Sequence, residues 1–293
     1  MSRLSRTVER LTSSIESASV LDPLADAIDS VVSRLPAGRT KDVLSGVALG
    51  HPLHPALVAV PIGAFSSAIF LDAFGEPEAA RRLIGLGLVS SVPAGLAGLS
   101  DWSDTRGAER RVGVAHMAVN TAGLSLLTAS WLARRAARYG SGRWLAVTGF
   151  GLVGASSWLG GHLAYALGVG VDTTAFLRPP TEWADAIAFS SLTEGQAVAV
   201  TVDATPVLLV KMGPDVHAIG DRCTHRGGPL HEGPIVDGCV ECPWHQSRFD
   251  LTDGSVVRGP ATRPAAAFFT RVMEGRVQVR RDEERTLRLN LAP

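Results

Sequence analysis

Residues 223–229 read Cys-Thr-His-Arg-Gly-Gly-Pro, and residues 242–247 read Cys-Pro-Trp-His-Gln-Ser. Each stretch holds one cysteine and one histidine close together, and 16 residues separate the first pair from the second. The chain has only 3 cysteines, too few for the disulfide framework of a small secreted domain. The pattern therefore predicts a bound metal centre, with the ligands Cys223, His225, Cys242 and His245.

The sequence around these pairs predicts an all-β domain at residues 182–293, joined to the preceding part of the chain by a linker at residues 172–181. Short runs of β-branched and apolar residues alternate there with turn residues. After residue 171 the 16 acids exceed the 13 bases, so we expect no basic groove and no nucleic-acid partner. The predicted strands are 197–202, 207–212, 216–219, 255–257, 268–272 and 277–280.

The two stretches resemble the ligand loops of the Rieske iron–sulfur family, in which each loop supplies one cysteine and one histidine to a [2Fe–2S] cluster. The turns at residues 227–229 (Gly-Gly-Pro) and 259–261 (Gly-Pro-Ala) are similar to those that wrap the cluster in that family. Glycine suits such turns because backbone N–H groups must approach the sulfides closely. The resemblance implies that the two cysteines bind the inner iron and the two histidines bind the outer iron.

A zinc ion is the alternative occupant, because two cysteines and two histidines also satisfy tetrahedral zinc. The domain would then be a zinc-stabilised interaction module without redox chemistry, and Cys239 would offer a second partner for Cys242. A Cys-x-His pair inside a β domain favours the cluster, and we expect Cys239 to be a small buried core residue. His217 and His231 lie outside the two loops, and we expect them on solvated loops.

Several positions depart from the high-potential Rieske proteins of cytochrome bc-type complexes. Gly228 and Trp244 stand where those proteins carry an extra cysteine in each loop, so no disulfide joins the loops. Ser247 is kept, but Phe249 replaces a tyrosine whose hydroxyl bonds to the cluster. Because hydrogen bonds to sulfur raise the potential, we expect a value toward the low end of the Rieske range of about −150 to +300 mV, as in ferredoxin-type members. Gln246, where glycine is commoner, has no explanation in the sequence.

The C-terminal domain is too small to be a complete Rieske oxygenase, which needs a second domain with a facial iron site of two histidines and one carboxylate. We therefore expect an electron carrier or oxidoreductase component with no catalytic residues of its own. Its expected partners are a redox protein or a quinone, and the membrane-anchored ferredoxin of a separate oxygenase system is the alternative.

Residues 51–171 predict a membrane domain. They carry only 15 charged side chains, which are clustered between uncharged apolar stretches. Each stretch approaches the ~20 residues that cross a hydrocarbon core of roughly 30 Å, and many glycines allow helices to approach closely. The sequence therefore predicts an all-α four-helix transmembrane bundle in contact with lipid, with buried soluble helices as the alternative. The predicted spans are Leu53–Phe74, Leu83–Leu99, Val112–Leu132 and Trp144–Val169.

The stretch Gly50-His51-Pro52-Leu53-His54-Pro55 resembles the opening of an uncharacterised family of four-span bacterial membrane proteins, over about residues 44–170. Because consecutive spans alternate in direction, several ionisable residues gather on one face, and these are His51, His54, Asp101, Asp104, His116 and His162. Ionisable groups inside a membrane are costly, so we take His54, His116 and His162 as a candidate site for haem b or a quinone. The alternatives are a metal ion, or histidines that only join helices and aspartates that cap loops.

Residues 1–50 predict an amphipathic helix that begins at Asp22 and Pro23 and ends near Gly38. We expect it to pack on the membrane domain or to lie at the bilayer surface, and docking of a partner is the alternative. The first 50 residues show no secretory signal and no twin arginine, whereas an exported Rieske domain needs such a signal. We therefore predict a multi-pass protein of the cell membrane with its Rieske domain on the cytoplasmic side.

Overall fold

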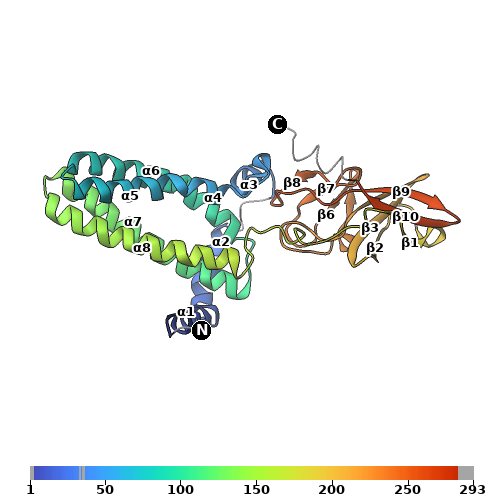
Figure 1. The fold of residues 1–293 in the computed structure, drawn as a ribbon, viewed down its shortest axis with the longest axis horizontal. Coiled ribbons are helices and arrows are strands. Elements are labelled where there is room, and N and C mark those ends of the chain that lie inside the picture. Colours follow the sequence, from blue (N-terminus) through green and yellow to red (C-terminus); the bar gives the residue numbers. More distant parts are fainter. Residues whose placement is uncertain (1–2, 33, 35–36, 283–293) are drawn as a thin grey trace. The chain divides into compact units, whose positions relative to one another are not determined.

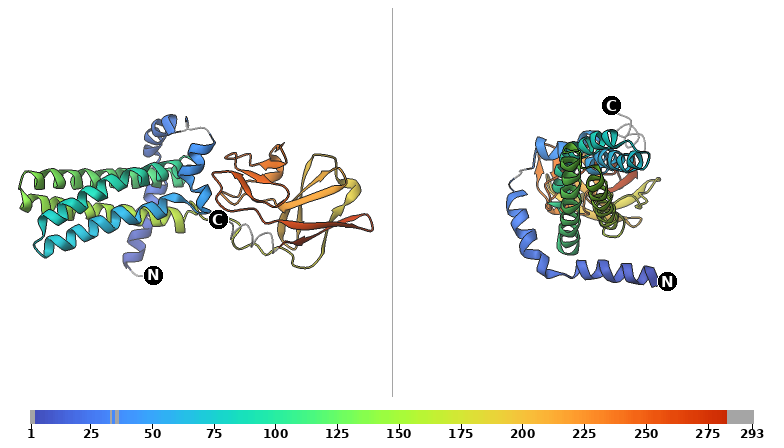
Figure 2. Two further views of the ribbon diagram at one scale, coloured as in Figure 1. Left: turned by 90° about the horizontal axis from the view of Figure 1, so that it is seen from above. Right: turned by 90° about the vertical axis from the view of Figure 1, so that its left-hand side faces the viewer.

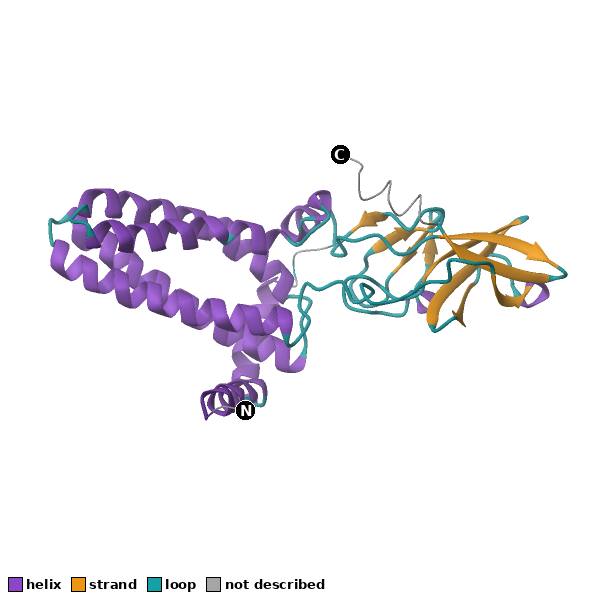
Figure 3. Ribbon diagram, in the orientation of Figure 1, coloured by secondary structure: helices purple, strands orange, loops and turns teal. Residues whose placement is uncertain are grey.

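The computed structural model describes residues 3–32, 34 and 37–282, and the chain divides into two compact units. A helical unit combines residues 1–35 with 53–169, and a β unit combines residues 36–52 with 170–293. Helices and strands separate accordingly along the chain (Figures 1 and 3). A helical region followed by a β-sheet domain is thus confirmed. Sequence reasoning grouped residues 1–50 as one segment, but the structure divides them between the units.

Four long helices run side by side in the helical unit (Figure 2). Three segments are long and apolar enough to cross a membrane, namely Leu53–Ala73, Pro77–Trp102 and Gly107–Arg135. Large apolar side chains such as Phe70, Leu86 and Val89 are exposed on them, which suits contact with lipid. The helices of the unit are α1 (Arg3–Glu16), α2 (Asp22–Val32), α4 (Leu53–Leu57), α5 (Ala59–Ala73), α6 (Pro77–Trp102), α7 (Gly107–Arg135) and α8 (Tyr139–Tyr165), with the short 3₁₀ turn η1 (Ser19–Leu21).

The fourth predicted span, Trp144–Val169, corresponds to helix α8, which begins and ends earlier, at Tyr139 and Tyr165. This helix is long enough to cross a membrane, but it is not among the segments that are also apolar enough. Glycine, serine and tryptophan take up much of it, and these residues lower its mean hydropathy. Four spans and a four-helix bundle in the membrane therefore remain a prediction.

A buried ion pair and an apolar core hold the long helices together near the α5–α6 and α7–α8 turns. Phe65, Ile84, Leu127 and Ala146, one from each long helix, belong to one buried cluster. Beside it, both Nη atoms of the Arg134 guanidinium donate to the Asp72 carboxylate at 2.7 and 2.5 Å. These side chains are almost fully buried, so the charges are compensated away from water.

The β unit consists of three small antiparallel sheets with strand orders β1-β10-β9, β2-β3-β4 and β5-β6-β7-β8. The cluster-binding candidates lie at the ends of strands in the second and third sheets. The strands are β1 (Ala184–Ala188), β2 (Ala197–Val202), β3 (Thr205–Met212), β4 (Asp215–Gly220), β5 (Ile235–Val236), β6 (Cys239–Glu241), β7 (Arg248–Asp250), β8 (Val256–Arg258), β9 (Phe268–Met273) and β10 (Arg276–Arg281). The 3₁₀ turns are η3 (Phe189–Ser191) and η4 (Leu230–Glu232).

The six predicted strands correspond to β2, β3, β4, β8, β9 and β10, with small shifts at their ends. Strands β5, β6 and β7 have only two or three residues, which is too short for an alternating apolar pattern to appear. The remaining missed strand, β1, has no strongly alternating burial either.

The β unit also includes a segment from the N-terminal side of the apolar helices. This segment holds helix α3 (Arg39–Ser45) and the 3₁₀ turn η2 (Val47–Leu49). Asp42 Oδ1 accepts a hydrogen bond of 2.9 Å from the backbone N–H of Gly259. A methyl group at Gly259 would collide with Val47, so the two segments are in close contact. Residues far apart in sequence thus complete the loop after β8.

Candidate metal centre

The two stretches that hold the cysteine–histidine pairs fold into the same local turn. In the first loop, after β4, the Cys223 carbonyl accepts from Gly227 N–H at 2.8 Å and the Cys223 N–H donates to the Gly228 carbonyl at 2.9 Å. In the second loop, between β6 and β7, Cys242 makes the equivalent bonds with Gln246 and Ser247, at 3.0 and 2.8 Å. The structure therefore presents each histidine two or three residues after its cysteine on matching turns.

Gln246 occupies a position that favours glycine. Its φ is 63°, and the equivalent residue of the first loop, Gly227, has a φ of 76°. A side chain is strained in this left-handed region, since Cβ crowds the following carbonyl. The guanidinium of Arg258 donates to the Gln246 carbonyl at 2.7 Å and helps to hold this conformation. This explains in part how glutamine is accommodated where glycine is commoner.

We expect Gln246→Gly to stabilise the β unit, because glycine adopts the left-handed conformation without the steric cost. The free energy of unfolding should rise by about 1 kcal/mol. Thermal unfolding of the detergent-solubilised protein, followed by circular dichroism and by the absorbance of the bound cluster, measures the change. Gln246→Ala is the matched control because it keeps Cβ. A glycine variant no more stable than the alanine variant would contradict the strain.

Cys223 and Cys242 meet inside the apolar core of the β unit. Each is 1% exposed, and both belong to a cluster of buried residues with Leu208 and Phe249. A hydrogen bond between the two thiols lowers the pKa of Cys242 to about 7 and raises that of Cys223, and burial adds to the latter effect. The two sulfurs are therefore close enough to share one metal ion, and thiolates are the form that binds it.

His225 and His245 lie next to each other, with ring centroids 5.0 Å apart and an edge-to-face orientation. The Nδ1 atom of each ring is buried. Burial and the neighbouring imidazole keep the pKa of His225 well below its usual value. Neutral imidazole is the form that binds a metal, so this environment suits a ligand.

Gly228 leaves room for the second loop beside the cysteines. A methyl group at this position would lie 2.9 Å from Cys242 Sγ and 3.1 Å from Cδ2 of Trp244. Within the described residues, no three side chains of histidine, cysteine, aspartate or glutamate converge as the ligands of one ion. The thiols and the imidazoles instead form two pairs, which fits two irons with two protein ligands each. A bound [2Fe–2S] cluster would supply one-electron redox chemistry here.

A third loop, after β8, contacts the second. Ser247 is fully buried, and its Oγ accepts a hydrogen bond of 2.9 Å from the backbone N–H of Ala261. This bond uses a lone pair and leaves the hydroxyl proton free to be donated. Phe249 is also fully buried in the core that contains both cysteines. Phe249 therefore offers only an aromatic C–H where the high-potential Rieske proteins have a tyrosine hydroxyl near the sulfurs.

We expect Phe249→Tyr to raise the reduction potential of the cluster. A hydroxyl that bonds more strongly to the reduced cluster, by about 1–1.5 kcal/mol, shifts a one-electron potential by roughly 40–60 mV. A redox titration followed by electron paramagnetic resonance measures the shift. Phe269→Tyr is the control because Phe269 is partly exposed on β9, outside that core. Equal potentials in the Phe249 variant and the unmodified protein would contradict this explanation.

Sequence reasoning missed several contacts of the ligand loops. The Thr173 hydroxyl donates to the Cys223 carbonyl at 3.0 Å, which ties the linker to the first loop. Asp221, buried at the end of β4, accepts from the backbone N–H of His231 and bonds to its ring, both at 2.8 Å. His231 is thus held by a carboxylate. Cys239 is buried at the start of β6, as expected of a core residue.

The other candidate residues lie in the helical unit. His54 Nδ1 bonds to the Ala94 carbonyl at 2.7 Å, and His116 Nδ1 bonds to the Ser156 carbonyl at 2.8 Å. His162 Nε2 instead bonds to Glu16 on helix α1 at 2.8 Å. His54 and His116 thus both bond to a backbone carbonyl through Nδ1, and His116 Nδ1 also lies 2.9 Å from the Ser156 hydroxyl oxygen, whereas His162 bonds to a carboxylate.

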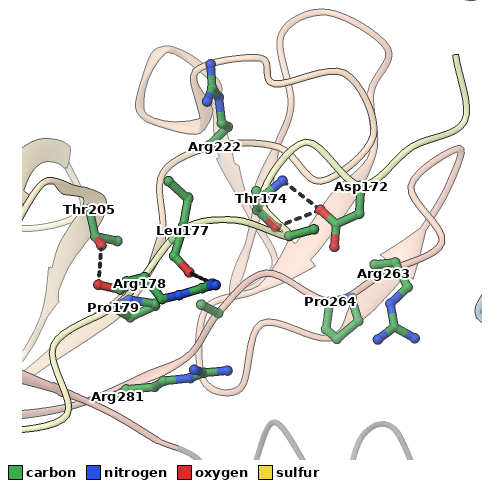
Figure 4. Close-up of a pocket in the computed structure, with 13 residues that line it drawn as sticks. Asp172, Thr174, Leu177, Arg178, Pro179, Thr205, Arg222, Arg263, Pro264 and Arg281 are labelled. Carbon is green, nitrogen blue, oxygen red and sulfur yellow. Dashed lines mark hydrogen bonds between the residues drawn. The ribbon is translucent and has the colours of Figure 1, made fainter. Parts of the chain in front are cut away.

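A cavity of about 240 Å³ lies in the β unit beside the linker, bordered by β3 and β4 (Figure 4). Thr174 lines it together with Asp172, whose Oδ1 accepts from the Thr174 N–H and hydroxyl. The cavity is rich in basic side chains, and its arginines are Arg178, Arg222, Arg263 and Arg281. None of the four ligand candidates lines it, so it is separate from the metal centre.

Comparison with known proteins matches both parts of the chain. Residues 182–274 match the family model of the Rieske [2Fe-2S] domain, and residues 50–173 match a model described as a predicted membrane protein (DUF2231). The anthranilate 1,2-dioxygenase ferredoxin subunit of Burkholderia cepacia is 34% identical over 98 residues, which cover 33% of this chain and 91% of that protein. The ferredoxin component of the naphthalene 1,2-dioxygenase system of Pseudomonas putida is 29% identical, with 33% and 94% covered.

Among solved structures, the ferredoxin of carbazole 1,9a-dioxygenase from Nocardioides aromaticivorans IC177 is 28% identical, with 33% of this chain and 96% of that chain covered and a TM-score of 0.32. The N-terminal match identifies a predicted membrane domain, in agreement with the three apolar helices. The Rieske match indicates a [2Fe–2S] cluster. Through residues 182–274, the chain belongs to the Rieske [2Fe-2S] domain family.

Proposed function

We propose that this protein is a membrane-anchored one-electron carrier, with Cys223 and Cys242 on the inner iron of its cluster and His225 and His245 on the outer iron. The observation that carries the proposal is the meeting of two buried thiols and two adjacent imidazoles on matching turns. The cluster would accept and release single electrons, and the chain itself would supply ligands and insulation rather than a substrate site.

Metal and sulfide analysis of the purified full-length protein tests this proposal. We expect two irons and two acid-labile sulfides per chain, and an electron paramagnetic resonance signal of the Rieske type after reduction. Zinc without iron or sulfide would instead select the zinc-stabilised interaction module and defeat the carrier.

An oxygenase or reductase protein is the partner that the relatives favour, because their names place them in dioxygenase systems. The surface beside His245, a proposed ligand of the outer iron, supports docking of a protein. Trp244 precedes His245 and is 46% exposed, and an exposed aromatic side chain is a common anchor at interfaces. In this version the helical unit serves only as an anchor.

The second version relays electrons between the cluster and a haem or quinone in the helical unit, where His54, His116 and His162 are the candidate residues. Alanine substitutions at these histidines distinguish the two versions. If the helices are only an anchor, the rate at which the reduced protein passes electrons to an oxygenase stays unchanged. If they hold a relay, electron transfer into the membrane stops while the cluster signal persists.

We further propose that α8 is a fourth span and that the Rieske domain lies in the cytoplasm. Four spans place the N-terminus and the Rieske domain on one side of the membrane, and three spans place them on opposite sides. Reporter fusions at each end of the full chain, active only in the cytoplasm or only outside it, separate these cases. Reporters active on opposite sides would reject the fourth span, and both active outside would reject the orientation.

A further inference from the structure

The helical unit contains an internal repeat with an offset of 62 residues, and the two helix–helix turns show it clearly. Gly75, after α5, has a φ of 79°, and Ala137, after α7, has a φ of 58°, so both turns use a left-handed residue at the same place. The next residue closes each turn with the same bond, from Glu76 N–H to the Leu71 carbonyl and from Arg138 N–H to the Ala133 carbonyl, both at 2.9 Å. The α5–α6 and α7–α8 hairpins therefore correspond residue by residue.

Packing inside the hairpins follows the same offset. Gly87 lies against Phe65 in the first hairpin, and the equivalent Gly149 lies against Leu127 in the second. The buried ion partners Asp72 and Arg134 are also 62 residues apart, so they occupy equivalent positions and pair across the repeat. Most other side chains differ, because exposed helix positions tolerate any apolar residue.

The repeat places two histidines at equivalent positions, His54 and His116. His54, on α4, donates from Nδ1 to a backbone carbonyl of α6, and His116, on α7, donates to one of α8; each acceptor lies 40 residues further along the chain. A carbonyl oxygen only accepts, so Nδ1 carries the proton and Nε2 keeps its lone pair. Histidines that bind metals usually donate their other ring nitrogen in this way.

A glycine one turn after each carbonyl lets the ring approach the helix. A methyl group at Gly98 would lie 2.8 Å from Nδ1 and Cε1 of His54, and one at Gly160 would lie 3.2 Å from Cε1 of His116. Both imidazoles are thus held in the same way, by a hydrogen bond to a carbonyl and by close packing against a glycine.

The apolar core shared by the two hairpins lies at the other end of the helices. It includes Phe65 and Leu127, which are seven residues from the buried ion pair, whereas the histidines are 18 residues, or roughly five turns, from that pair. A smaller buried cluster joins the hairpins near the α6–α7 turn, where Trp102 of α6 and Val114 of α7 meet Ala25 of α2. The apolar contact between the hairpins is therefore less extensive at the end that carries the histidines. Bundles commonly hold cofactors between facing helices at such a level.

We propose that His54 and His116 are the axial ligands of a haem b held between the two hairpins. Haem presents two equivalent axial positions on its two faces, which matches two equivalent imidazoles from a repeat. His162 leaves the candidate set, because it bonds to Glu16 and its equivalent in the first hairpin is Ser100. This inference rests on the relay version of the proposed function.

Titration of the full-length protein in detergent with hemin tests the site. We expect one hemin per chain and a low-spin spectrum typical of two imidazole ligands. His54→Gly and His116→Gly should each lose that spectrum, and free imidazole should restore it, which a merely structural histidine does not allow. His162→Gly should keep it.

Glycine variants give a matched comparison that leaves both ligands in place. Gly98→Ala should weaken hemin binding at least tenfold, because its methyl group displaces the His54 ring. Gly95→Ala, on the same helix with no atom within 4 Å of its Cβ position, should bind normally. If the protein binds no hemin but shows the cluster signal, the haem site is wrong and the electron-carrier proposal stands. If the protein binds hemin but shows no cluster signal, the electron-carrier proposal is wrong and the haem site stands.

Discussion

His225→Ala and His245→Ala should each abolish the [2Fe–2S] cluster. In the proposed ligand set, each change removes one of the two protein ligands of the outer iron, and alanine offers no donor atom in its place. The visible absorbance and the paramagnetic signal should both fall to background, and iron and sulfide should be lost together. Circular dichroism of the same samples reports whether the β unit stays folded.

The control for this prediction is His217→Ala. His217 lies on β4 opposite Val210, outside both ligand loops, so its removal should leave iron content and spectrum unchanged. A His225 or His245 variant with full iron and sulfide content and an unshifted spectrum would show that the ligand assignment is wrong.

Asp72→Asn should be the most damaging single change in the helical unit. It leaves the Arg134 guanidinium, which is fully buried, without a compensating charge. Removal of one partner from a buried ion pair typically costs about 3–5 kcal/mol of unfolding free energy. Thermal unfolding in detergent, followed by helical circular dichroism, should show a much lower midpoint. Arg134→Gln should have an effect of similar size.

The internal repeat supplies the control for this pair. Because residues 72 and 134 are equivalent, the exchanged variant Asp72→Arg with Arg134→Asp should recover a large part of the lost stability. The exposed pair of Arg81 and Glu78 gives the comparison for a surface contact, and its loss should cost less than about 1 kcal/mol. An exchanged variant as unstable as the single variants would show that the two environments are not equivalent.

The Rieske domain could be predicted from sequence because the expected ligands are chemically rare residue types at a fixed spacing. The longer strands were also predictable, since six or more residues reveal an alternating pattern. The contact of Asp42 with Gly259 was not, because nothing local marks residues 217 positions apart as neighbours. The strain at Gln246 likewise appears only once its φ is known.

In the helical unit, sequence reasoning was limited by the low hydropathy of α8 and by the divergence of the internal repeat. Hydropathy predicts three of its apolar helices. Glycine and serine lower the mean hydropathy of α8, although this helix packs as closely as the others. The repeat is almost invisible in sequence because lipid-facing positions diverge freely. Some residues that touch another helix, such as Gly87 and Gly149, keep their identity.

Excision of the iron–sulfur domain as a soluble fragment needs more than a cut in the linker. A fragment that starts at residue 170 omits Asp42 and Val47, so the N–H of Gly259 loses its acceptor and an apolar contact opens to water. A circularly permuted gene that appends residues 37–50 to the fragment through a flexible spacer would restore both. The chain therefore passes between the helical unit and the β unit three times, where an ordinary tandem fusion has a single connection.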